Sequence, residues 1–201
     1  MKKVISTLFI VALLTGTQAF AQAQLAIGLK GGPNFARFDI NDAGTSFKNK
    51  TGFHGGAFAL VKLGKIGVQP EIIFSQQGSR FSFSGQDLQS NFSYVNIPVM
   101  LKTYLVAGLN LQIGPQFGFL TNAGGEIVDE TGDVRPINKE MFKKSDISAG
   151  IGLGWDLPFG LTVDARYNLG LTKIEDEAAL NTTKNQVIQL SVGYKILKLG
   201  K

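Results

Sequence analysis

Residues 146–171 read DISAGIGLGWDLPFGLTVDARYNLGL, and this stretch decides the fold. On both sides of Pro158-Phe159-Gly160, apolar residues alternate with polar residues or glycine. An alternation with a period of two is typical of β-strands whose two faces meet different surroundings. A three-residue connection that ends in glycine suits a tight hairpin turn. The stretch therefore predicts an antiparallel β-hairpin with one apolar face and one face of polar residues and glycine.

The same alternation recurs along the rest of the chain. Eight segments show it, at residues 24–36, 52–63, 66–77, 92–104, 109–120, 146–157, 161–171 and 185–197. Each is long enough for a tilted strand to cross a bilayer, which takes roughly 9–11 residues. None of them is a continuous apolar run of the length that a membrane-spanning helix needs. In a membrane this chain must form a closed barrel, because only closure satisfies every backbone group of a sheet in lipid.

The connections between these segments alternate strictly between short and long. The short ones are Gly64-Lys65, Val106-Ala107-Gly108 and Pro158-Phe159-Gly160. The long ones cover residues 37–51, 78–91, 121–145 and 172–184. Outer-membrane barrels have this asymmetry, with tight periplasmic turns and longer external loops. The sequence thus predicts an all-β fold, a closed eight-stranded antiparallel up-and-down transmembrane β-barrel.

The start of the chain is typical of an export signal. A basic beginning is followed by the apolar stretch from Val4 to Leu14, which is too short to span a bilayer as a helix. Ala19-Phe20-Ala21 then provides a cleavage site with small residues at its first and third positions. We therefore expect residues 1–21 to be a signal peptide and residues 22–201 to be the outer-membrane β-barrel domain. Cleavage after Ala23 is the alternative.

Charge and cysteine content exclude several classes of protein. The chain has 20 basic and 15 acidic residues, so removal of Lys2 and Lys3 with the signal leaves 18 against 15, a net charge of +3. No basic stretch is interleaved with stacking aromatics, so no nucleic-acid partner is expected. The absence of cysteine excludes disulfides and thiolate metal sites.

Strand parity places charged side chains on the polar face, which faces the lumen of a barrel. With Gly64-Lys65 as a two-residue turn, Leu63 pairs with Ile66 and His54 lies opposite Ser75. The charged lumen residues expected from parity are Lys30, Glu71, Asp164 and Arg166. Unpaired charges at membrane depth are costly, and side chains fill the interior of an eight-stranded barrel. We therefore expect a structural ionic network in the lumen; an ion path or gate is the alternative.

A soluble, lipocalin-like barrel is the alternative to a barrel in lipid, and it would have an apolar interior and a polar exterior. Here the apolar face is continuous and nearly uncharged, as lipid requires. Aromatic residues toward the strand ends resemble the girdles of outer-membrane barrels. They are Tyr104, Trp155 and Phe159 on the turn side and Phe35, Phe53 and Phe92 on the other side. The pattern favours an outer-membrane location, with outer-membrane lipid as a partner.

His54 is the only histidine, so any chemistry that needs histidine must use it. Ser75 lies opposite His54 and Glu71 shares its face, so a Ser–His–carboxylate set that acts on outer-leaflet lipid is one hypothesis. However, Glu71 is four residues deeper than Ser75, roughly 13 Å along a strand, which is too far to orient the imidazole directly. We expect a polar histidine at the mouth of the lumen and no catalytic residue.

Two other motifs are expected to be structural. Residues 150–154, GIGLG, lack the following helix and the spacing of a phosphate-binding loop. The acidic residues Asp129, Glu130 and Asp133 match no EF-hand spacing. We therefore expect no cofactor and no metal site.

Six further segments stand out in order along the mature chain. They are GLKGGPNF at 28–35, GFHGG at 52–56, QPEIIFSQQG at 69–78, NIPVMLK at 96–102, RYNLGL at 166–171 and SVGY at 191–194. Together they resemble the PorT-like outer-membrane β-barrel family. The resemblance implies an integral outer-membrane protein, in a family most of whose members have no defined activity. One departure is the end of the chain, where Tyr194 is followed by KILKLGK instead of closing on an aromatic residue.

A fold does not identify a function, because sites do. The leading hypothesis is a non-enzymatic membrane protein whose exposed loops contact an envelope or surface protein partner, or which serves envelope integrity. One alternative is a PorT-like accessory component of a secretion or motility assembly. Another is an outer-membrane lipid-modifying enzyme that uses His54. A solute pore is disfavoured because the lumen is narrow.

Overall fold

The structure is a computed structural model that describes residues 23–39, 47–83, 86–128, 134–136, 145–171 and 184–200. The predicted signal peptide, residues 1–21, lies outside these ranges. The strands are β1 (Ala23–Asp39), β2 (Phe47–Leu63), β3 (Ile66–Phe83), β4 (Gln86–Tyr104), β5 (Leu109–Val128), β6 (Val134–Pro136), β7 (Ser145–Asp156), β8 (Leu161–Gly170) and β9 (Lys184–Leu199). Within the described residues, no helix has the length and apolar character needed to cross a membrane.

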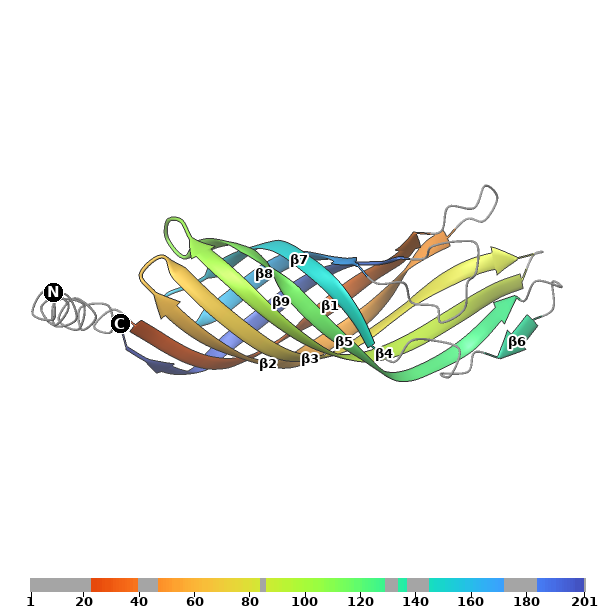
Figure 1. Cartoon of the computed structure of the whole chain (residues 1–201), viewed down its shortest axis with the longest axis horizontal. Helices are drawn as coiled ribbons and strands as arrows, with labels where there is room; N and C mark the ends of the chain where they lie inside the picture. Colours follow the sequence, from red (N-terminus) through yellow and green to blue (C-terminus); the bar gives the residue numbers. More distant parts are fainter. Residues whose placement is uncertain are drawn as a thin grey trace, which may run out of the picture.

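Eight of these strands close into an antiparallel up-and-down barrel (Figure 1). Each strand of the barrel pairs with its sequence neighbours, and β1 pairs with β9 to complete the ring. The three-residue strand β6 pairs with β5 alone in the part of the chain that the structure describes. The predicted fold is therefore confirmed, with β6 as an addition that the sequence pattern did not indicate.

The register also agrees with the tight turns. Leu63 pairs with Ile66 and His54 pairs with Ser75, as the turn Gly64-Lys65 predicts. In the other hairpins, Gly152 lies opposite Arg166. Gly64 has a φ of 58°, in the left-handed region that favours glycine and that tight hairpin turns require.

The external side differs from the prediction. Residues 78–91 do not form a loop, because β3 and β4 remain paired as far as Phe83 and Gln86. The predicted loop 121–145 contains the end of β5 and all of β6. The physical reason is that the strands have left the lipid at this level. The backbone hydrogen bonds between β3 and β4 continue there. Outside the lipid, however, the sequence need not alternate apolar and polar residues, and this alternation is the pattern that predicts the strands.

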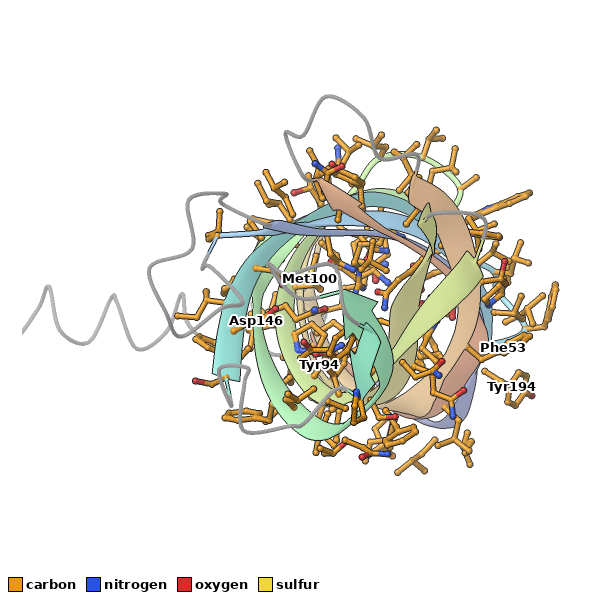
Figure 2. All side chains as sticks on the ribbon, turned by 90° about the vertical axis from the view of Figure 1, so that its right-hand side faces the viewer. Phe53, Tyr94, Met100, Asp146 and Tyr194 are labelled. Carbon is orange, nitrogen blue, oxygen red and sulfur yellow. The ribbon has the colours of Figure 1, made fainter. Side chains whose placement is uncertain are left out.

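The outward face of the barrel supplies the apolar surface that lipid requires. Its exposed side chains include Leu29, Ile72, Ile113, Ile151 and Val192. Phe53 and Tyr194 point away from the barrel, whereas Tyr94 and Met100 lie inside it (Figure 2).

Two of the predicted girdle residues are on the wrong face. Tyr104 and Phe92 are only 6% and 4% exposed and belong to the lumen. Both have the parity of Met100, which is fully buried, so parity decides the face and the position near a strand end does not. Trp155, Phe159 and Phe53 do point outward.

Candidate functional site

The lumen is packed with long polar and apolar side chains. Its fully buried members include Lys102, Leu60, Met100, Gln69, Gln112 and Glu71. Glycines on neighbouring strands make room for them; Gly154, for example, lies against the side chains of Gln112, Asn110 and Asp164. The interior is thus a core, as expected for a barrel of eight strands.

The centre of the lumen holds a bidentate ion pair between β3 and β8. Arg166 Nη1 donates to Glu71 Oε2 at 3.0 Å, and Arg166 Nη2 donates to Glu71 Oε1 at 2.9 Å. Gln69 donates a further hydrogen bond of 2.8 Å to Glu71 Oε1. The planar guanidinium matches a carboxylate in this geometry better than a lysine ammonium does. The pair therefore fixes β3 and β8 to one another across the lumen.

Lys30 of β1 connects this pair to a second carboxylate. Its Nζ lies 3.4 Å from Glu71 Oε1 and 3.0 Å from Asp164 Oδ2. Gln112 contacts both halves, because its Oε1 accepts from Arg166 at 2.9 Å and its Nε2 donates to Asp164 Oδ1. The structure thus brings together all four residues that parity assigned to the lumen network, Lys30, Glu71, Asp164 and Arg166.

The network continues toward the tight turns through residues that the sequence analysis did not select. Lys102 Nζ donates to Gln69 Oε1 and to Asp156 Oδ1, both at 3.1 Å. Asp156 Oδ2 accepts from the Tyr104 hydroxyl and from Lys195 Nζ, both at 2.8 Å. Strand parity was the signal that would have found them. Lys102 is two residues from Met100 and Asp156 is two residues from Gly154, so each shares the inward face of its neighbour.

The complete network has four cations, on Lys30, Lys102, Arg166 and Lys195, and three carboxylates, on Glu71, Asp156 and Asp164. Each of these side chains is at most 5% exposed. In such surroundings a charge is stable only when it is paired and hydrogen-bonded. The arrangement can brace the barrel from within.

His54 forms its hydrogen bond with a serine other than the one that lies opposite it in the register. Its Nε2 lies 2.8 Å from Ser191 Oγ on β9, although Ser75 is opposite His54 in the β2–β3 register. The side chain of Gln77 instead donates to Ser75 at 3.1 Å, and Asn34 donates to it at 2.8 Å. Gly32 of β1 lies opposite His54, so the contact with Ser191 on β9 spans this strand.

The surroundings of His54 do not form a catalytic triad. The buried Nδ1 of His54 has no hydrogen-bond partner among the described residues, so no carboxylate orients the ring. An orienting group on the second nitrogen is part of the geometry that activates a serine. The His54–Ser191 pair is therefore a polar contact between β2 and β9.

A small polar cavity lies above the network, toward the external side. Asn96, Ser148, Asn168 and Asp146 line it together with Tyr94. Its volume is about 10 Å³, which is the size of a site for one water molecule. Figure 2 looks into the barrel from the external end and labels Tyr94 and Asp146. The cavity is too small for an organic ligand.

An apolar outer band, tight turns on one side and a packed ionic lumen define an integral outer-membrane β-barrel protein. The family described as outer membrane protein beta-barrel domain matches residues 20–176, and the chain belongs to this family. The protein is therefore located in the outer membrane.

Two solved structures have the same fold. Neisserial surface protein A (NspA) superposes with a TM-score of 0.53 at 10% identity, covering 85% of this chain and 97% of that one. Ail, the attachment invasion locus protein of Yersinia pestis, superposes with a TM-score of 0.50 at 16% identity, covering 89% of this chain and 99% of that one. At these identities the likeness shows the fold alone. No curated protein matches the sequence.

Proposed function

We propose that this barrel is a non-enzymatic surface protein whose outer strands contact an anionic ligand at the cell surface. The unequal length of its strands carries the proposal. β3, β4 and β5 have 18, 19 and 20 residues, whereas β7 and β8 have 12 and 10. Because about 9–11 residues suffice to cross a bilayer, β3, β4 and β5 continue beyond the lipid on the external side. Figure 1 shows them reaching past the rest of the barrel, with β6 at their edge.

Basic residues in the outer part of the β2–β3 hairpin suggest the charge of the ligand. Lys48 of β2 and Arg80 of β3 are paired in the register of the outer part of the hairpin. Two like charges at directly paired positions repel one another and destabilise a sheet. Two basic residues at paired positions in the outer part of this hairpin favour an anionic ligand there. Ail was solved in complex with the heparin analogue sucrose octasulfate, which makes a sulfated sugar a practical probe for this chain.

Lys48→Gln/Arg80→Gln is expected to weaken the binding of sucrose octasulfate at least tenfold, or about 1.4 kcal/mol. Titration calorimetry of the purified barrel in an uncharged detergent, at one fixed salt concentration, measures the effect. Lys65→Gln is the matched control, since Lys65 lies in a tight turn at the opposite end, and it should leave the affinity unchanged. If the unaltered barrel did not bind the sugar, or if Lys65→Gln weakened binding equally, the proposed surface site would be wrong.

The non-enzymatic part of the proposal is supported by the geometry around His54. His54→Ala is expected to leave the barrel folded and the lipid composition of the outer membrane unchanged, because Ser191 is the one hydrogen-bond partner of the imidazole among the described residues. Mass spectrometry of extracted lipid, together with a gel-shift assay for the folded barrel, tests this. A lipid change that His54→Ala removes from a folded barrel would support the lipid-modifying alternative.

We infer two finer assignments from the sequence. The six segments that resemble PorT-like barrels support membership in that group, with an accessory role in secretion or motility as the second functional hypothesis. The basic, apolar and small-residue pattern of residues 1–21 supports a cleaved export signal that precedes the barrel domain at 22–201. Envelope integrity remains the alternative role if no surface partner exists.

A further inference from the structure

The periplasmic mouth of the barrel contains a cavity of about 580 Å³. It lies beside the two turns 105–108 and 157–160, at the end of the barrel where β1 begins and β9 ends. Its volume is within the range of pockets that bind small molecules, about 300–1,000 Å³. The lumen network closes its inner end, because Asp156 and Tyr104 belong to both.

The charge of this cavity is strongly positive. Three lysines line it, Lys62, Lys195 and Lys198, against a single carboxylate, Asp156, among the described lining residues. That carboxylate is already engaged from inside, because Lys102 binds its Oδ1 at 3.1 Å and Tyr104 binds its Oδ2 at 2.8 Å. Lys195 also binds Oδ2, at 2.8 Å, so Lys102 and Lys195 together offset the one negative charge, and Lys62 and Lys198 remain in excess.

The side chains of Lys62 and Lys198 are held in place without being neutralised. Lys62 Nζ lies 4.0 Å from the centre of the Tyr104 ring, a cation–π contact that positions an ammonium and preserves its charge. Lys198 Nζ donates to the carbonyl oxygen of Pro158 at 2.9 Å, which uses one of its three donors. Neither lysine has an ion-pair partner among the described residues. Cations fixed around a cavity in this way are preorganised for an anion.

The rest of the lining indicates which anion. Lysine binds phosphate as a point charge, and several converging ammonium groups suit an anion that carries one to two charges. Tyr104, Leu157 and Pro158 add apolar lining against which the organic part of a phosphate ester can pack. We propose that the periplasmic mouth is a binding site for a phosphate group, either free or carried by a phospholipid headgroup.

The chain contains its own reporter for this site. Trp155 is the only tryptophan, and it lines the cavity, with its Nε1 bonded to the carbonyl oxygen of Ala107 at 2.9 Å. Sodium phosphate and sn-glycerol 3-phosphate, titrated into the barrel in maltoside micelles at constant ionic strength, are expected to change its fluorescence saturably. Sodium chloride is the ionic control and should give no saturable change.

Variants locate the site. Lys62→Gln/Lys198→Gln is expected to weaken phosphate binding at least tenfold, whereas Lys184→Gln, at the external start of β9, should leave it unchanged. If the double variant did not fold, Lys198→Gln alone provides the test, because Lys198 is exposed and outside the lumen network. An unchanged affinity in a folded Lys198→Gln barrel, or an equal loss in the outer variant, would refute the site.

A second arm distinguishes the two sources of phosphate. Phosphatidylglycerol is mixed into the micelles at increasing mole fraction, with uncharged diacylglycerol as the matched lipid. A saturable change of Trp155 fluorescence with soluble phosphate alone identifies a site for free phosphate. A change with phosphatidylglycerol alone identifies a site for a lipid headgroup. If neither compound changed Trp155 fluorescence beyond its control, the proposal would be overturned.

Discussion

Glu71→Gln is expected to destabilise the folded barrel by about 3–5 kcal/mol, the cost of breaking a buried ion pair. The change keeps the shape of the side chain and removes its charge, so the guanidinium of Arg166 loses its carboxylate and the ammonium of Lys30 retains only Asp164. Glu71 has a side-chain exposure of 0%, and water cannot replace the missing interaction. The free energy of unfolding in urea, measured in lipid vesicles, gives the effect.

The double variant Glu71→Gln/Arg166→Gln tests whether the two residues act as a pair. It should cost less than the sum of the single changes, because removing both partners leaves one fewer isolated charge than removing either one. Asp87→Asn, at the external end of β4, is the matched control and should change the stability by less than about 0.5 kcal/mol. Costs that simply add would show that Glu71 and Arg166 are not coupled.

Gly154→Val is the second change with a large expected effect, and it acts through shape. A Cβ at this position would overlap the side chain of Gln112 and come within 2.6 Å of Asn110 Oδ1 and Asp164 Oδ1. Overpacking of a filled core costs about 1–3 kcal/mol and at times more, and here it also displaces the groups that bind Asp164. The yield of folded barrel, scored by gel shift after refolding into lipid, is expected to fall sharply.

Gly55→Val offers a control with the same substitution. The nearest atom to a Cβ at Gly55 is the carbonyl oxygen of Lys30 at 3.9 Å, so a valine fits without displacement. Phe53 and Ala57 on either side of Gly55 are exposed, which places residue 55 on the outward face, where an added apolar side chain is tolerated. Equal loss of folding in both variants would mean that the packing of the lumen does not explain the effect.

The fold was predictable because lipid imposes a simple rule on each strand. An apolar face toward the membrane and a polar face toward the lumen produce the alternation, and the tight turns then fix the register of Leu63 with Ile66. The rule ends at the surface of the lipid. The loss of alternation therefore predicts a loop for the outer parts of β3 and β4, although their backbones stay paired as far as Phe83 and Gln86.

The candidate site was predictable in part, for a related reason. Parity assigns a residue to the lumen, and Glu71 and Arg166 are both buried there. It does not give the height of a side chain or its reach across a neighbouring strand. The contact of His54 with Ser191 spans a third strand, β1, and no pairwise register contains that information.

The pairing of β1 with β9 makes insertion of this protein into the membrane depend on the whole set of barrel strands. Leu25 is paired with Leu199, so the wall of the barrel is incomplete until the final strand is in position. A chain that stops before β9 has two sheet edges whose N–H and C=O groups meet hydrocarbon, which a bilayer does not accept. The membrane itself therefore discriminates against truncated chains, and every copy that resides there has been synthesised and delivered to its last strand.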